Sequence, residues 1–174
     1  MKQILIVDGY NIIGAWPELQ KLKDIGLEEA RDKLIGMLAN YQSYSGRRVI
    51  VVFDAYQVPG IGGKYMQHQL EIHFTKEKET ADTVIERFVG ELSSRRTQVY
   101  VATSDFVEQS VTFGQGALRL PARELLHGVR QSEKEMRLRM EEQASGRIRN
   151  SFDSKLSGEQ RNLLERWRRG DGPR

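Results

Sequence analysis

The sequence predicts a three-layer α/β fold with a central, mainly parallel sheet of about five strands and a helical C-terminal tail. Three observations predict it. Short β-favouring apolar runs alternate with segments of helical periodicity, the first runs are continuous enough to be buried on both faces, and three of them end on an aspartate. Strands that alternate with helices become parallel neighbours, because the crossovers between them are right-handed.

The opening run Ile4–Val7 predicts a strand that is buried on both faces. It passes directly into Asp8 and Gly9, and we expect the glycine to permit a sharp turn where a side chain would obstruct the backbone. The strand therefore places Asp8 at the carboxyl end of the sheet, where open α/β sheets bind ligands.

A helix is expected next, because apolar residues recur at helical spacing from Leu27 to Tyr41, and Gly46 is expected to end it. The β-branched run Arg48–Phe53 then predicts a second buried strand. This strand ends on Asp54 and so repeats the pattern of the first strand.

The segment 55–69 contains a proline and several glycines and shows no periodicity, which predicts a mobile loop over the open end of the sheet. Alternating apolar and polar residues over 70–74 predict a short edge strand. Thr80 is expected to cap a helix over 81–92 that carries Asp82 in its first turn.

A third run that ends on an aspartate predicts a strand over 98–104 with Asp105 at its end. A weaker strand is expected over 117–120, and Pro121 is suited to the first position of a following helix. That helix is long and rich in charge, and we expect it to end at the break 144–146.

These elements divide the chain into a domain of residues 1–146 and a basic tail of residues 147–174 with a short helix over 157–169. Residues 1–122 hold 14 Lys and Arg against 15 Asp and Glu, whereas residues 123–174 hold 13 against 9. The positive charge is therefore concentrated toward the C-terminus, which is the part expected to meet a polyanion.

Composition excludes several classes of protein. No apolar run approaches the roughly 20 residues that cross a bilayer, and the first strand begins too early for a signal peptide, so we expect a cytoplasmic protein without membrane contact. The absence of cysteine excludes disulfides and thiolate sites. The glycines at 60–63 do not join a strand to a helix and no phosphate-loop motif is present, so no nucleotide cofactor is expected.

Asp8, Asp54 and Asp105 each follow a predicted strand, so their carboxylates are expected at one edge of a parallel sheet, near the helix that carries Asp82. Clustered carboxylates repel one another unless a divalent cation lies among them. Oxygen ligands suit Mg²⁺ or Mn²⁺, and the chemistry that such a site favours is in-line attack of water on phosphorus.

Each acid also has a structural interpretation. An aspartate at a strand end often forms a turn or caps a helix, as Asp105 could do, and Asp54 could anchor the glycine-rich loop instead of touching metal. Glu79 is either a ligand or a solvated acid. Asn11 and Ser104 are expected to contact and orient the metal ligands or the water without binding the metal themselves.

Four short motifs occur in order over about the first two-thirds of the chain: Asp8-Gly9-Tyr10-Asn11, Phe53-Asp54-Ala55, Glu79-Thr80-Ala81-Asp82 and Thr103-Ser104-Asp105. Together they resemble those of the YacP-like NYN-domain ribonucleases, relatives of the PIN nucleases. The resemblance implies a PIN-like fold and Mg²⁺ or Mn²⁺ at Asp8, Asp82 and Asp105. We add Asn11 and Asp54, which lie in the same motifs, to the predicted catalytic residues. The resemblance also implies endonucleolytic cleavage of single-stranded messenger RNA, with the ribosome as a partner.

A nuclease needs cations near its acids, because interactions of Lys and Arg with the backbone dominate affinity for RNA. The candidates are Arg47, Arg48, Lys64, Tyr65, Lys76, Lys78, Arg147, Arg149, Arg168 and Arg169. The basic residues of the tail have an equally good interpretation as the solvated face of a helix.

Two other functions share parts of this pattern. A non-catalytic RNA- or ribosome-binding module with the same fold is the alternative to an endoribonuclease. A phosphoacceptor receiver domain fits poorly, because Asp8 is followed by Gly9 instead of a second acid, and the last predicted strand ends in Pro121 instead of a lysine.

Overall fold

The computed structural model describes residues 2–54, 63–104 and 116–155, together with residues 158, 159, 162, 165 and 166. Of residue 65 and residues 146–155 it describes the backbone alone. The strands in these ranges are β1 (Lys2–Asp8), β2 (Arg48–Phe53), β3 (Gly63–Gln67), β4 (Leu70–Phe74), β5 (Thr97–Thr103) and β6 (Leu118–Pro121). The helices are α1 (Gly9–Ala15), α2 (Pro17–Ile25), α3 (Leu27–Ser45), α4 (Ala81–Leu92) and α6 (Ala122–Lys155).

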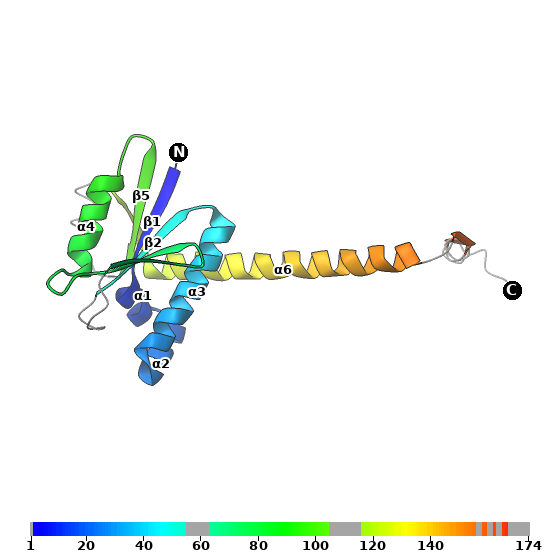
Figure 1. Cartoon of the computed structure of the whole chain (residues 1–174), viewed down its shortest axis with the longest axis horizontal. Coiled ribbons are helices and arrows are strands. Elements are labelled where there is room, and N and C mark those ends of the chain that lie inside the picture. The colour runs from blue at the N-terminus through cyan, green and yellow to red at the C-terminus, as the bar shows by residue number, and fades with distance from the viewer. Residues whose placement is uncertain are drawn as a thin grey trace. The chain divides into compact units, whose positions relative to one another are not determined.

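The strands form one sheet in the order β3-β4-β2-β1-β5-β6, in which each neighbouring pair is parallel except β3 with β4 (Figure 1). The predicted mainly parallel sheet is confirmed. In the centre, Ile6 of β1 lies opposite Ile50 of β2 on one side and Val101 of β5 on the other. Asp8 therefore ends a central strand, as the sequence predicts.

The two faces of the sheet have separate cores, which makes three layers. Ile4 and Ile6 pack with the apolar side of α4, whereas Leu5 and Val7 pack with α1, α3 and the first turns of α6. This division follows from strand geometry, since successive side chains point to opposite faces. Figure 1 shows α4 and α3 on opposite sides of the sheet. Each fully buried aliphatic side chain in these cores contributes roughly 1.5–3 kcal/mol to the free energy of unfolding.

Trp16 joins the second face of the sheet to the beginning of α6. Its side chain is 1% exposed, and its indole N–H donates to the backbone carbonyl of Ala122 at 2.8 Å. A buried indole N–H needs a hydrogen-bond acceptor, and the carbonyl of Ala122, 106 positions away in the sequence, supplies it. It fixes the first residue of α6 against the junction of α1 and α2.

Several elements differ from the sequence prediction. α1 and α2 were not anticipated, although the proline at position 17 is a recognised helix-start signal. Residues 63–67 form β3 instead of belonging to a loop, so β4 is the second strand of the sheet and not its edge. The rest of the predicted loop, from position 55 to 62, lies outside the described residues.

The C-terminal helix also differs. α6 continues without interruption through 144–146, so the predicted break is wrong. A single glycine inside a helix costs only about 1 kcal/mol relative to alanine, and no proline is present there to stop it. The chain forms two compact units, Met1–Glu133 and Lys134–Arg174, and α6 contributes residues to both. The functional division into residues 1–146 and 147–174 stays a prediction.

None of the helices in the described ranges combines the length and the apolar character needed to cross a lipid bilayer.

Candidate active site

Asp8 is the last residue of β1 and lies at the carboxyl edge of the sheet. It lies opposite Val52 of β2, whose side chain packs under α4. Because residues in register project to the same face, Asp8 projects toward the face that α4 covers. The side chain is 9% exposed, and one of its oxygens accepts a hydrogen bond from the backbone N–H of Asn11 at 3.2 Å.

This hydrogen bond makes Asp8 the N-cap of α1. The interpretation that an aspartate at a strand end caps a helix is therefore correct for Asp8. An ionised aspartate has two oxygens with about four acceptor sites, so one capping bond through Oδ1 is compatible with metal coordination.

Asp82 lies in the first turn of α4 and is exposed. The cap of this helix is Thr80, whose hydroxyl accepts from the backbone N–H of Thr83 at 3.3 Å, so Asp82 is not needed for capping. The connection before α4 is fixed to the sheet, because the N–H of Thr75 donates to the carbonyl of Phe53 at 3.0 Å. Asp82 is therefore presented on the same face and at the same edge as Asp8.

Gly9 explains how α1 can begin directly beside the candidate acid. A Cβ atom on Gly9 would lie 2.2 Å from a ring carbon of Phe53, far inside the contact distance. The expected obstruction is confirmed, although the backbone enters a helix here instead of making a separate turn. Tyr10 packs on the same ring with centroids 5.0 Å apart, and its hydroxyl accepts from Arg31 at 3.4 Å.

Asn11 and Ser104 are in direct contact. The side-chain oxygen of Asn11 accepts from the backbone N–H of Ser104 at 2.6 Å and from its hydroxyl at 2.8 Å. An N–H group requires an acceptor, so this pairing also fixes which end of the amide faces Ser104. Asn11 therefore holds the chain in place where it leaves β5, immediately before Asp105.

The remaining acids stand at the same edge. Asp54 directly follows β2 and is half-buried. Glu79 forms an ion pair with Arg87 and accepts from the backbone N–H of Lys76 at 3.5 Å. Burial disfavours its charged form, but the bonds from Arg87 and Lys76 outweigh burial and hold the pKa of Glu79 below its ordinary value. Glu79 is thus a paired acid and not a solvated one.

Among the residues that the structure describes, no group of three or more His, Cys, Asp or Glu side chains forms a metal site. Asp105, the third predicted ligand, lies outside these residues. Asp8 at the end of β1 and Asp82 in the first turn of α4 nevertheless belong to the same face and edge of the sheet, and carboxylate oxygens are the donors that Mg²⁺ and Mn²⁺ prefer. The donor set present fits a hard divalent ion.

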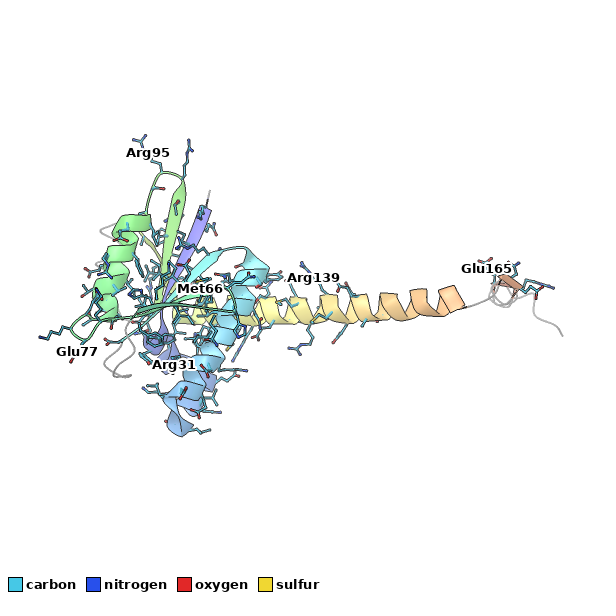
Figure 2. All side chains as sticks on the ribbon, in the orientation of Figure 1. Arg31, Met66, Glu77, Arg95, Arg139 and Glu165 are labelled. Atoms are coloured by element: carbon cyan, nitrogen blue, oxygen red, sulfur yellow. The ribbon has the colours of Figure 1, made fainter. Side chains whose placement is uncertain are left out.

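The predicted RNA-binding cations are divided between the two edges of the sheet. Lys76 and Lys78 are exposed in the connection before α4, beside Asp82. Arg47 and Arg48 stand at the amino end of β2, so the expectation that they surround the acids is wrong. Figure 2 shows the two ends of α4: Glu77 marks the connection beside the acids, and Arg95 marks the opposite edge.

Arg48 and Lys64 have a structural partner in Glu71. The carboxylate is 2.9 Å from Nη2 of Arg48 and 2.8 Å from Nζ of Lys64. The hydrogen bonds from Arg48, aided by Lys64, outweigh burial and lower the pKa of Glu71 to about 2. These ion pairs link β2, β4 and β3, and an additional role in RNA binding stays a prediction.

Other predicted residues lie where the structure gives no side chain. These are Tyr65, Arg147, Arg149, Arg168 and Arg169. By contrast, sequence reasoning missed two described arginines, Arg119 and Arg123, which line a pocket with Ser104 at the carboxyl edge. The available signal was that they flank the end of a parallel strand, which must finish at the same edge as Asp8.

Comparison with known proteins gives consistent matches over nearly the whole chain. The model of the YacP-like NYN domain family matches residues 5–169. The chain is 52% identical over 172 residues to "Uncharacterized protein YacP" of Bacillus subtilis (strain 168), a match that covers 97% of this chain and 98% of that protein. The crystal structure of Rae1 (YacP) from Bacillus subtilis is 51% identical with a TM-score of 0.76, covering 97% of this chain and 95% of that one. A crystal structure of a point mutant of Rae1 is 52% identical with a TM-score of 0.74, covering 83% and 85%.

Proposed function

The chain belongs to the YacP-like NYN domain family, which is a family of PIN-like nucleases, and we propose that it is a divalent-metal-dependent endoribonuclease that cleaves single-stranded RNA. The observation that supports the proposal is that Asp8 ends β1 while Asp82 lies in the first turn of α4, the helix that packs on the face toward which Asp8 projects. Asp8 is in register with Val52, whose side chain packs with α4, and this supports a site to which both residues contribute. Capping of the helices does not require both of them.

In this proposal Asp8, Asp82 and Asp105 hold Mg²⁺ or Mn²⁺. When bound, the ion supplies Lewis acidity toward the attacking water and the phosphodiester oxygens. Asn11 positions Ser104, which precedes Asp105 in the chain, at the end of β5. Asp54, which directly follows β2, would be the acid that accepts the proton of the attacking water. The water oxygen joins phosphorus, the bond from phosphorus to the 3′ oxygen breaks, and that oxygen takes a proton, leaving 5′-phosphate and 3′-hydroxyl ends.

Cleavage of a 5′-labelled single-stranded RNA in Mn²⁺ or Mg²⁺ tests the proposal. Asp8→Asn and Asp82→Asn are expected to lower the rate at least about 100-fold, because each removes a charged ligand. Asparagine is as good an N-cap as aspartate, so Asp8→Asn preserves the start of α1. Asp24→Asn, on the exposed side of α2, is the matched control and should cleave like the wild type. Equal rates in all four proteins would overturn the assignment.

Calorimetric titration with Mn²⁺ separates this proposal from a non-catalytic RNA-binding module. The nuclease is expected to bind the ion, and Asp8→Asn, Asp82→Asn and Asp105→Asn are each expected to lose that binding. A protein that binds RNA but neither Mn²⁺ nor Mg²⁺, and that leaves the RNA intact, would have the alternative function.

We propose further that the substrate is messenger RNA engaged by the ribosome in the cytoplasm. The resemblance of the four motifs supports this choice, and so does the excess of positive charge over residues 123–174, with 13 Lys and Arg against 9 Asp and Glu.

A further inference from the structure

A solvent-open pocket lies at the carboxyl edge of the sheet, between the ends of β5 and β6 and the start of α6. Thr103, Ser104 and Pro121 are among the residues that line it, and Arg119 and Arg123 supply its charge. No acidic side chain of the described residues contributes to its lining. The charged residues that line the pocket in the described ranges are therefore both cations, whereas Asp8, Asp54 and Asp82 give the edge beside it a negative charge.

The two arginines differ from the other cations near the sheet. Arg48 and Lys64 are paired with Glu71, and Arg87 is paired with Glu79. Within the described part of the chain, neither Arg119 nor Arg123 forms an ion pair, and both are exposed. Their guanidinium groups are available to an anion from solution.

The pocket adjoins the candidate active site through shared residues. Ser104 lines the pocket and also donates to Asn11, whose own backbone N–H bonds to Asp8. Arg119 lies opposite Val101, whose side chain packs under α4, so Arg119 projects to the same face as Asp8.

The strand order arranges these groups along the edge. Lys76 and Lys78 follow β4, Asp54 follows β2, Asp8 ends β1, Ser104 follows β5, and the arginines flank the end of β6. Neighbouring strands are about 4.8 Å apart, so the edge from β4 to β6 spans roughly 19 Å. After β4 the lysines alternate with Glu77 and Glu79, so among the described residues the arginines at the β6 end are the cations of this row that no neighbouring acid offsets. This end is where a polyanionic strand lying across the edge would find a cationic contact.

We propose that the pocket formed by Arg119 and Arg123 binds a backbone phosphate of the RNA strand, at a position other than the scissile one. This inference rests on the proposed function and specifies where its substrate runs. Guanidinium groups suit the task, because their paired N–H donors match two oxygens of a phosphate. The bound phosphate holds the strand so that a neighbouring linkage lies over Asp8 and Asp82.

Fluorescence anisotropy with a labelled single-stranded RNA in EDTA measures phosphate binding without cleavage. Arg119→Gln and Arg123→Gln are each expected to weaken binding about 5- to 10-fold, and the double variant more. The slope of log affinity against log salt should become shallower by about 0.7 for each phosphate that the variant no longer neutralises. The matched control is Arg95→Gln with Arg96→Gln, which removes the same charge from exposed positions at the opposite edge and should change affinity less than twofold.

The Arg119→Gln, Arg123→Gln protein should also cleave RNA with a KM that rises by a larger factor than kcat falls, since the arginines bind a phosphate other than the scissile one. Lysine at both positions should recover part of the affinity by restoring charge without the paired donors. Wild-type affinity in the double variant, or an equal loss of affinity in the control, would overturn the proposal that this pocket binds a phosphate. If the wild type still cleaves RNA, the nuclease assignment would be unaffected. A wild type that neither binds nor cleaves RNA would overturn both.

Discussion

Ser104 donates two hydrogen bonds to one oxygen of Asn11, from its backbone N–H at 2.6 Å and from its hydroxyl at 2.8 Å. The two residues are 93 positions apart in the chain. They connect α1, which Asp8 caps, to the point where the chain leaves β5. The two hydrogen bonds therefore join two of the segments that carry the predicted metal ligands.

Removing the acceptor should loosen this connection. Asn11→Ala is expected to lower the free energy of unfolding by roughly 1–2 kcal/mol, because two donors lose their partner. Asn11→Asp keeps an oxygen in the same place and should cost less than Asn11→Ala. Urea unfolding measures both, and Mn²⁺ affinity should fall in the alanine variant. An alanine variant as stable as the wild type would contradict the assigned hydrogen bonds.

Gly9 should tolerate no side chain. Gly9→Ala is expected to destabilise by roughly 1–3 kcal/mol, because its methyl group would overlap the ring of Phe53. Gly36→Ala is the control, since a Cβ there meets nothing within 4 Å and the residue is inside α3. It should stabilise by roughly 0.5–1 kcal/mol. Adding Phe53→Leu to Gly9→Ala should recover part of the loss, and strictly additive effects would argue against the overlap.

The turn between β3 and β4 should be open to improvement. His68 and Gln69 have φ values of 51° and 65°, in the left-handed region that non-glycine side chains disfavour. His68→Asn with Gln69→Gly supplies the residues that such two-residue hairpin turns prefer, and we expect a gain of about 1 kcal/mol in thermal or urea unfolding. Gln67→Gly, in strand β3, is the control and should destabilise the protein. A loss of stability in both the turn variant and this control would contradict the turn geometry.

The ion pairs of Glu71 should make stability depend on pH. Its pKa is about 2 in the folded protein against 4.5 ordinarily, so folding favours the ionised form. This contribution is complete above pH 4.5 and is lost as the pH falls toward 2. Glu71→Gln should therefore lower the free energy of unfolding by roughly 1–3 kcal/mol at pH 7, and the difference from the wild type should shrink below pH 4.5.

The control for this experiment is Glu18→Gln. Glu18 pairs with Lys33 at 3.4 Å, but both side chains are half exposed, and pairs of that kind contribute about 0–1 kcal/mol. Its removal should change stability little at any pH. If the difference between wild type and Glu71→Gln stayed constant from pH 7 to pH 3, the ion pairs of Glu71 would not have the assigned role.

Association with ribosomes should depend on the basic tail. Replacing Arg147, Arg149, Arg168 and Arg169 by glutamine is expected to reduce co-sedimentation at least about 10-fold, because interactions with the RNA backbone dominate such affinity and weaken with salt. The control replaces Lys21, Lys23, Arg95 and Arg96, which removes equal charge from exposed positions of the first unit. Equal losses of co-sedimentation in both proteins would show that it depends on overall charge alone. No loss in the tail variant would show that these arginines do not contribute to ribosome association.

Much of the fold could be predicted from local patterns. The buried strands β1 and β2 are continuous apolar runs because both of their faces are covered, and α4 shows its capping threonine and helical period directly. Once these strands are taken as parallel, the position of Asp8 at a common edge follows from geometry. This part of the site is a consequence of periodicity alone.

The rest depends on tertiary interactions that no local pattern encodes. β3 was missed because its turn uses His68 and Gln69, which lack the usual Asn-Gly signature although their φ values are those of such a turn. The pairing of Arg48 with Glu71 joins different strands, so the sequence alone could not show that this arginine already has a partner. Asn11 and Ser104 could be named, but not paired, before the fold was known.

The buried indole of Trp16 also gives the molecule an optical reporter. The chain has two tryptophans, so Trp167→Phe would leave Trp16 as the sole source of indole emission. Its emission would move to longer wavelength when water reaches the ring, and its bond to Ala122 ties that signal to the docking of the α6 start. Loss of the first unit's structure could thus be followed by intrinsic fluorescence, without attaching any label.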